Sequence, residues 1–287
     1  MTAELKFYPY DHPELIPAGS IRCFETEMIP YPDHRRRRIL VWLPADYDGE
    51  KRFPVIYLHD GQGVFECGDG RHKLQADRAL ELLRVTEGIS AIVVAIDTAE
   101  TRGSELTPPL RRGERGAVVN GHPVPIIDEP STTDLYAEFV VNTLKPMIDA
   151  NFATLPDAGH TCIGGISAGG SASYYMILKY PEVFGKAIVC SPGFPMFSLP
   201  LMLEDLDSYD FERLKDHRIA FYNGDQGIDV TSVDYVLAVY RKLKEKGLDR
   251  RQCMFLLDTR QTHDEKPWGK YLPEILRFLF REDNAEF

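Results

Sequence analysis

Short apolar runs rich in β-branched residues alternate with longer segments of helical periodicity along most of this 287-residue chain. Parallel strands joined by crossover helices produce such an alternation, because each helix covers a face of the sheet before the chain returns to it. The pattern therefore predicts an α/β fold with a mostly parallel central sheet and helices on both faces. The expected strands, eight in all, lie near residues 24–29, 39–43, 55–59, 91–97, 161–164, 187–190, 219–223 and 254–258.

Segments with apolar residues at helical spacing lie between these runs. They cover residues 75–83, 133–150, 168–179, 233–246 and 272–281. The stretch around 99–131 carries many proline, glycine and charged residues without a clear period, so we expect a long loop beside the pocket there. No internal repeat or interdomain linker interrupts the pattern, and the length suits one large domain. We therefore predict a single domain over residues 1–287.

The charge balance argues against several classes of partner. The chain has 33 basic and 44 acidic side chains, which gives a formal net charge of −11. A chain of this charge repels polyphosphates and anionic membrane surfaces, so neither nucleic acid nor a membrane is an expected partner. The basic run Arg35–Arg38 leads directly into an apolar strand, and we interpret it as a solvated strand entrance rather than an anion site.

Cysteine usage and the first residues of the chain indicate a reduced compartment. The five cysteines, Cys23, Cys67, Cys162, Cys190 and Cys253, lie far apart and show neither CxxC nor Cys/His metal spacing. The chain does not begin with a basic segment followed by an apolar one, and no apolar stretch approaches the roughly 18 residues of a membrane span. We therefore expect a cytoplasmic protein without a disulfide framework.

The sharpest chemical signal is Gly165-Ile166-Ser167-Ala168-Gly169-Gly170, a G-x-S-x-G segment between an apolar strand and a helical segment. This context is that of the nucleophile elbow in the α/β-hydrolase fold, which we therefore expect here. Glycine is needed because larger flanking side chains would collide with the neighbouring strand and helix. The turn presents the Ser167 hydroxyl to a pocket and places the Ala168 N–H where an oxyanion forms.

Chain order selects the general base. In this fold the nucleophile, the acid and the histidine follow one another along the chain, each at the carboxyl end of a strand. Six of the eight histidines precede Ser167, and His217 precedes its strand instead of following it. His263 follows the last expected strand in a polar loop, from which it can accept the Ser167 proton. We therefore predict His263 as the base.

The acid should follow the strand at 219–223, where the loop reads Gly224-Asp225-Gln226-Gly227-Ile228-Asp229. Its task is to hold the histidine tautomer and stabilise the imidazolium. Acids in this loop commonly lie a few residues past the glycine that ends the strand, which favours Asp229. Asp225 remains an alternative, and either residue could instead serve a turn or cap a helix.

Several segments in order resemble the esterase family that includes ferric enterobactin (enterochelin) esterases, S-formylglutathione hydrolase (esterase D) and carbohydrate-linked acyl esterases. The resemblance covers most of the chain. It is carried by 38–44, 53–62, Ile96-Asp97 with Arg102, Glu105 and Pro108, Tyr136 with Phe139, 144–146, 165–170, 262–265, Trp268 and 272–274.

The resemblance implies a second oxyanion donor, the backbone N–H of Gln62 just after Gly61, paired with that of Ala168. It also supports His263. The chain departs from the family at Gly227, where members often carry a carboxylate, so a Ser-His dyad assisted by another group stays open. Arg102 and Glu105 could line the pocket, but we favour the interpretation that they form a local ion pair that braces their loop.

These residues predict a serine esterase that cleaves a small-molecule carboxylic ester by two-step acyl transfer, without a metal or organic cofactor. By resemblance, its substrates are similar to those of enterochelin esterase-like or carbohydrate acyl esterases. Two alternatives are an acyltransferase using the same nucleophile, as in mycolyl transferases of related fold, and a non-catalytic binding module. The intact Ser167 and His263 argue against the latter. The sequence does not identify the natural ester or the oligomeric state.

Overall fold

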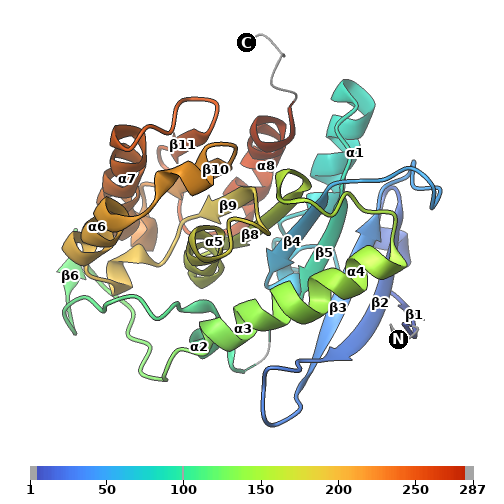
Figure 1. Cartoon of the computed structure of the whole chain (residues 1–287), viewed down its shortest axis with the longest axis horizontal. Helices are drawn as coiled ribbons and strands as arrows, with labels where there is room; N and C mark the ends of the chain where they lie inside the picture. The colour runs from blue at the N-terminus through green and yellow to red at the C-terminus, as the bar shows by residue number, and fades with distance from the viewer. Residues whose placement is uncertain (1–4, 99, 282–287) are drawn as a thin grey trace.

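The computed structural model describes residues 5–98 and 100–281, so residue 99 of the expected loop and the two ends of the expected domain lie outside the described residues. A nine-stranded sheet forms its centre, in the order β1-β2-β3-β5-β4-β8-β9-β10-β11 (Figure 1). The strands are β1 (Tyr8–Pro9), β2 (Ser20–Glu27), β3 (Arg36–Leu43), β4 (Val55–His59), β5 (Ile92–Ile96), β8 (Thr161–Ile166), β9 (Lys186–Cys190), β10 (Arg218–Gly224) and β11 (Cys253–Asp258).

The sheet is parallel from β5 through β11 and antiparallel where β1, β2 and β3 extend it. Strands β4 and β5 are buried along their whole length, which explains their continuous apolar sequences. All eight strands expected from the sequence are present, and the predicted fold class is confirmed. The short strand β1 was not predicted.

The helices are α1 (Ala76–Glu87), α2 (Arg102–Leu106), α3 (Thr133–Phe139), α4 (Lys145–Asn151), α5 (Ala168–Lys179), α6 (Leu199–Ser208), α7 (Val230–Glu245) and α8 (Glu265–Phe280). The five helical segments expected from periodicity are all present. The one expected at 133–150 contains a π-helical turn, Val140–Leu144, between α3 and α4. Pro146 follows this turn and cannot donate to the carbonyl four residues earlier, which accounts for the local change of helical register.

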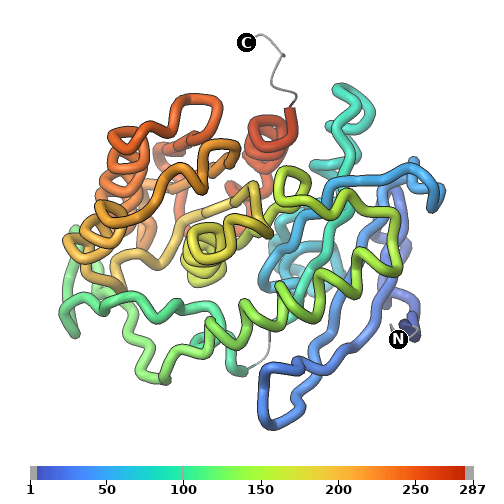
Figure 2. The backbone as a smooth tube through the Cα atoms, in the orientation of Figure 1, coloured from blue at the N-terminus to red at the C-terminus, as the bar shows by residue number. Residues whose placement is uncertain are grey.

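Helices cover both faces of the sheet. Leu80 of α1 and Ile275 of α8 pack in one apolar core, whereas Phe139 of α3, Ile177 of α5 and Val239 of α7 pack in the other. In Figure 2 the N-terminal part of the chain, in blue, and the α7 segment, in orange, lie at opposite sides of the molecule, as expected from the two edges of the sheet. No helix among the described residues is long and apolar enough to cross a membrane.

The segment expected as a long loop contains short elements. Helix α2 occupies its beginning, and a separate hairpin pairs β6 (Val118–Val119) with β7 (His122–Pro123). These elements are too short for a helical or strand period to be read from the sequence.

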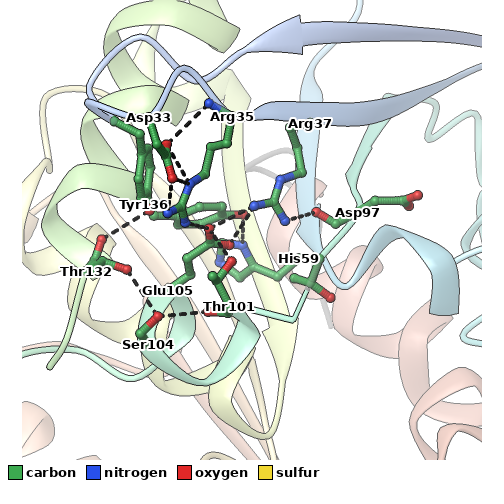
Figure 3. Close-up of polar contacts among 12 residues, drawn as sticks. Asp33, Arg35, Arg37, His59, Asp97, Thr101, Ser104, Glu105, Thr132 and Tyr136 are labelled. Carbon is green, nitrogen blue, oxygen red and sulfur yellow. Dashed lines mark hydrogen bonds and ion pairs between the residues drawn. The ribbon is translucent and has the colours of Figure 1, made fainter. Parts of the chain in front are cut away.

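The basic run at 35–38 is not fully solvated, so the interpretation of it as a solvated strand entrance is wrong for one of its arginines. Arg37 is only 3% exposed and donates two hydrogen bonds, of 2.8 and 2.9 Å, to the fully buried carboxylate of Glu105. It also donates to the Asp97 carbonyl at 2.8 Å (Figure 3). Alternation along β3 points every second side chain inward, which places this arginine inside the molecule. The pair attaches α2 to the sheet.

Candidate active site

Ser167 occupies a strained turn between β8 and α5. Its backbone adopts φ 59° and ψ −123°, a conformation that a non-glycine residue rarely takes. A Cβ on Gly165 would lie 2.7 Å from the Gly169 carbonyl carbon, and one on Gly170 would lie 2.8 Å from the Cys190 oxygen. The glycines are therefore required by the close approach of the helix to the sheet, as the sequence motif implied.

Backbone hydrogen bonds hold this turn in place. The Ser167 N–H donates to the Cys190 carbonyl at 2.9 Å, and the Ser167 carbonyl accepts from the N–H groups of Ser171 and Gly193. Ala168 is the first residue of α5, and the first N–H groups of a helix have no acceptor within the helix. Its N–H is therefore available to a negatively charged oxygen.

His263 lies in the loop between β11 and α8, and its Nδ1 is 2.6 Å from Asp229 Oδ1. The Asp229 side chain is 1% exposed and the His263 side chain 28%, so the pair has one buried and one solvent-facing member. An ionised carboxylate only accepts hydrogen bonds, so Nδ1 carries the proton in this contact and Nε2 is left as the acceptor. The Trp268 ring meets the imidazole edge-on, with centroids 4.8 Å apart.

Of the two aspartates considered from the sequence, Asp229 contacts His263 and Asp225 does not. Asp225 is half-buried and accepts hydrogen bonds from the Gln226 side chain and the Arg260 N–H. The Gln226 bond and the Arg260 bond hold the pKa of the Asp225 carboxyl below its usual value. Asp225 thus braces the loop between β10 and the residues after β11.

The departure at Gly227 has a steric reason. Gly227 has φ +59°, and a Cβ there would lie 2.8 Å from the Thr262 hydroxyl oxygen. Any side chain at this position would be both strained and crowded. The chain instead forms a 3-10 turn, Gly227–Asp229, that ends with the carboxylate facing His263.

The turn after β4 carries the second expected oxyanion donor. Asp60 has left-handed backbone angles, and a Cβ on Gly61 would lie 2.7 Å from Asp97 Oδ1. The Gln62 side chain exchanges two hydrogen bonds with Thr98, of 2.7 and 3.0 Å. The buried Lys73 ammonium donates to the Gln62 carbonyl at 3.2 Å. These contacts hold Gln62 by its side chain and its carbonyl, and the peptide that presents the Gln62 N–H is held by the Val64 N–H, which donates to the Gly61 carbonyl at 3.2 Å.

Arg102 does not pair with Glu105, so the expected local ion pair is wrong. The Arg102 guanidinium donates two hydrogen bonds to Asp60, of 2.6 and 2.8 Å. Thr98 donates a further one to the same carboxylate at 2.8 Å. Glu105 faces inward to Arg37, 68 positions away in the chain, while Arg102 faces the turn after β4. The i, i+3 spacing of the two residues permits a local pair, and the sequence could not show that each side chain has a more distant partner instead.

His59 lies behind the same turn, where its Nδ1 is 2.7 Å from the Tyr136 hydroxyl (Figure 3). The residue is 3% exposed, and burial lowers its pKa to about 4. It is therefore a neutral imidazole near the site. Chain order had removed it from the candidates for the base, and its buried position agrees with that choice.

One cavity of about 630 Å³ joins these elements. Ser167, His263 and Gln62 all line it. Its other charged or polar walls include Asp60, Arg71, His72, Lys73, Arg102, Asp264 and Glu265. A larger depression of about 1390 Å³ is lined by residues at the beginnings of β9 and β10, away from Ser167. Within the described ranges, no group of three or more His, Cys, Asp or Glu side chains is arranged to hold a metal ion.

Comparisons with known proteins show what the whole chain is similar to. A family model described as "Putative esterase" matches residues 33–279. The uncharacterized protein YbbA of Bacillus subtilis (strain 168) is 22% identical over 263 residues, which are 87% of this chain and 94% of that protein.

Two solved structures share the fold. An IroE-like serine hydrolase from Shewanella oneidensis has a TM-score of 0.69 at 18% identity and covers 93% of this chain and 82% of its own. A ferric enterobactin esterase from Salmonella typhimurium has a TM-score of 0.66 at 19% identity and covers 90% of this chain and 58% of its own. The resemblance predicted from the sequence is confirmed.

Proposed function

This chain belongs to the esterase family whose model matches it and is accordingly a carboxylic ester hydrolase, and we propose that Ser167, His263 and Asp229 carry out the reaction through a covalent acyl-enzyme. One observation supports the assignment most strongly. The strained Ser167 turn and an imidazole oriented by a buried carboxylate line the same cavity. Nucleophile, base and orienting acid are the parts that serine acyl transfer requires.

In the first half of the reaction, His263 Nε2 takes the Ser167 hydroxyl proton as the oxygen attacks the ester carbonyl. The negative charge that develops on the carbonyl oxygen is stabilised by the backbone N–H groups of Gln62 and Ala168. The imidazolium is stabilised by the buried Asp229 carboxylate, 2.6 Å from Nδ1. His263 then gives its proton to the departing alkoxide, which leaves as the alcohol.

In the second half, water attacks the Ser167 ester. His263 accepts a proton from this water, and the same two N–H groups stabilise the second tetrahedral intermediate. The intermediate collapses with return of the proton to the serine oxygen, and the carboxylic acid is released. The fixed turns around Ser167 and Gln62 hold the donors in place before substrate arrives, so little reorganisation is needed.

The substrate that we propose is a small-molecule ester. A cavity of about 630 Å³ lies within the usual size of small-molecule sites. Many charged side chains of its wall are already engaged with one another, such as Arg102 with Asp60 and His72 with Asp264. This wall favours a polar, hydrogen-bonding ester over a long aliphatic one, in keeping with a neighbour named for ferric enterobactin.

The test is hydrolysis of p-nitrophenyl acetate and butyrate by wild type and Ser167→Ala. We expect kcat of the variant to fall by several orders of magnitude, about 10³-fold or more, with an unchanged melting temperature. Ser208→Ala is a matched control, because it removes the hydroxyl of a serine at the end of α6 that donates to the Asp205 carbonyl and does not line the cavity. Unchanged hydrolysis by a well-folded Ser167→Ala would refute the proposal.

A further inference from the structure

Ser191 and Trp268, which the mechanism above does not use, form one hydrogen-bonded chain with Asp229. The Trp268 indole nitrogen lies 2.9 Å from Ser191 Oγ, and Ser191 Oγ lies 2.9 Å from Asp229 Oδ2. All three residues are buried: Trp268 is 3% exposed, and Ser191 and Asp229 are each 1% exposed. The other carboxylate oxygen, Oδ1, faces His263 at 2.6 Å.

The chemistry of the three groups fixes the direction of each bond. An indole N–H can only donate, so the Ser191 oxygen accepts from Trp268. The single hydroxyl proton of Ser191 is then free for Asp229, whose ionised carboxylate only accepts. The Gly224 N–H adds another donor to Oδ2 at 3.2 Å. Asp229 therefore has donors on both of its oxygens and a defined orientation toward His263.

The backbone of Ser191 is strained in a way that indicates a use for its side chain. Ser191 follows β9 directly and has φ +39°, in the region that favours glycine. Its N–H donates to the Tyr222 carbonyl at 2.7 Å, which holds it between β9 and β10. Glycine would fit this backbone with less strain but would leave Asp229 Oδ2 without the hydroxyl donor.

Trp268 acts on the histidine from two sides. Its nitrogen reaches Asp229 through Ser191, and its ring packs edge-on against the imidazole at 90°. The residue lies in the first turns of α8, directly after the His263 loop. One side chain thus fixes the plane of the imidazole and, through Ser191, the carboxylate that orients it.

We propose that Ser191 and Trp268 are positioning residues for ester hydrolysis, with Ser191 orienting Asp229 and Trp268 orienting both Ser191 and His263. This inference rests on the proposed Ser167-His263-Asp229 mechanism. Ser191 is not among the residues that line the cavity, so its loss should alter turnover and leave substrate binding unchanged.

Steady-state kinetics of Ser191→Gly and Ser191→Ala test whether Ser191 orients Asp229. We expect kcat to fall about ten- to a hundredfold at an unchanged KM, because a buried hydrogen bond to a charged group is lost. Ser191→Gly should keep the melting temperature of wild type, since it removes backbone strain. Ser232→Ala is the matched control, because this buried serine donates to the Pro192 carbonyl and not to Asp229. A kcat for Ser191→Gly equal to that of the control would overturn the inference.

A double-mutant cycle tests the coupling. Trp268→Phe removes the indole donor, and its effect on kcat should be at least threefold smaller in the Ser191→Ala background than in wild type. Trp42→Phe is the control, because Trp42 is equally buried and donates to the Ala18 carbonyl, far from the site. Fully additive effects of Ser191→Ala and Trp268→Phe would contradict the hydrogen-bonded chain.

A readout without turnover separates this inference from the proposed function. In the Ser167→Ala protein, the proton between His263 and Asp229 should give a low-field ¹H NMR resonance that is absent from Ser167→Ala/His263→Ala. Adding Ser191→Gly should move or broaden it, whereas adding Ser232→Ala should not. An unmoved resonance would overturn the positioning role even if wild type proved to be an active esterase. A moved resonance in an inactive wild type would refute only the proposed function.

Discussion

Asp225 and Asp229 show how four residues of separation change what a carboxylate can do. Both follow β10, but Asp229 is 1% exposed and contacts His263, while Asp225 is more exposed and bonds to the loop around it. Motif and chain order selected Ser167, His263 and the loop of the proposed acid from the sequence. They could not separate the two aspartates, because their burial depends on the turn at Gly227 and its approach to Thr262.

Replacing the two aspartates separately should give very different enzymes. In the proposed mechanism, Asp229→Asn removes the carboxylate that stabilises the imidazolium and favours the wrong tautomer, so kcat should fall about 10³- to 10⁴-fold. Asp225→Asn should leave kcat within about threefold of wild type, because Asp225 bonds to Gln226 and Arg260 and makes no hydrogen bond to His263. Steady-state hydrolysis of p-nitrophenyl acetate by both variants is the measurement. Equal losses for the two would contradict the assignment of the acid.

His59 should make stability depend on pH. Burial lowers its pKa to about 4 from an unfolded value near 6.5, so between these values the unfolded chain binds a proton that the folded protein does not. Stability is therefore lost as the pH falls through this window. When the pH is lowered from about 7.5 to 4.5, wild type should lose roughly 2 kcal/mol more of its unfolding free energy than His59→Gln does.

Urea unfolding of both proteins at the two pH values measures this difference. Asp97 acts in the opposite sense, because burial raises its pKa to about 6. It is present in both proteins, so its contribution cancels in the comparison. A pH-independent difference between wild type and His59→Gln would show that His59 is not a buried neutral imidazole.

At the scale of elements, the strands were easier to predict than the connections. The eight predicted strands have β-branched or alternating sequences that report burial directly. Helix α2 and the β6–β7 hairpin are too short to show a period, and α6 was missed although Pro200 near its start is a common helix-opening signal. The buried Arg37–Glu105 pair joins β3 to α2 across 68 positions of sequence, and no local pattern indicates such a contact.

Glu105→Gln should loosen the attachment of α2. The substitution leaves the Arg37 charge buried without its carboxylate, which should lower the free energy of unfolding by about 3 kcal/mol. Glu204→Gln is the matched control, because it removes a carboxylate from the exposed contact with Arg111 and should cost less than about 1 kcal/mol. Urea denaturation compares the two. If both variants lost the same small amount of unfolding free energy, the Arg37–Glu105 pair would not be what holds α2.

At the scale of the whole molecule, the parallel sheet explains why residues far apart in sequence share one cavity. Ser167 follows β8, the Gln62 turn follows β4, and Asp229 and His263 follow β10 and β11. Parallel strands end at the same edge of the sheet, so all four segments converge there. The alternating pattern of the sequence was enough to predict this convergence, whereas the supporting contacts of Ser191, Lys73 and Asp60 depend on packing between distant segments.

Covalent labelling shows whether Ser167 is an activated nucleophile and does not require the natural ester. The folded protein is treated with a fluorophosphonate, and the adduct is detected by intact mass and located by peptide mapping. We expect one adduct, on Ser167, that is absent from Ser167→Ala and forms much more slowly in His263→Ala. No adduct on the folded wild type, or equal labelling of Ser167→Ala, would contradict the assignment of Ser167 as the nucleophile.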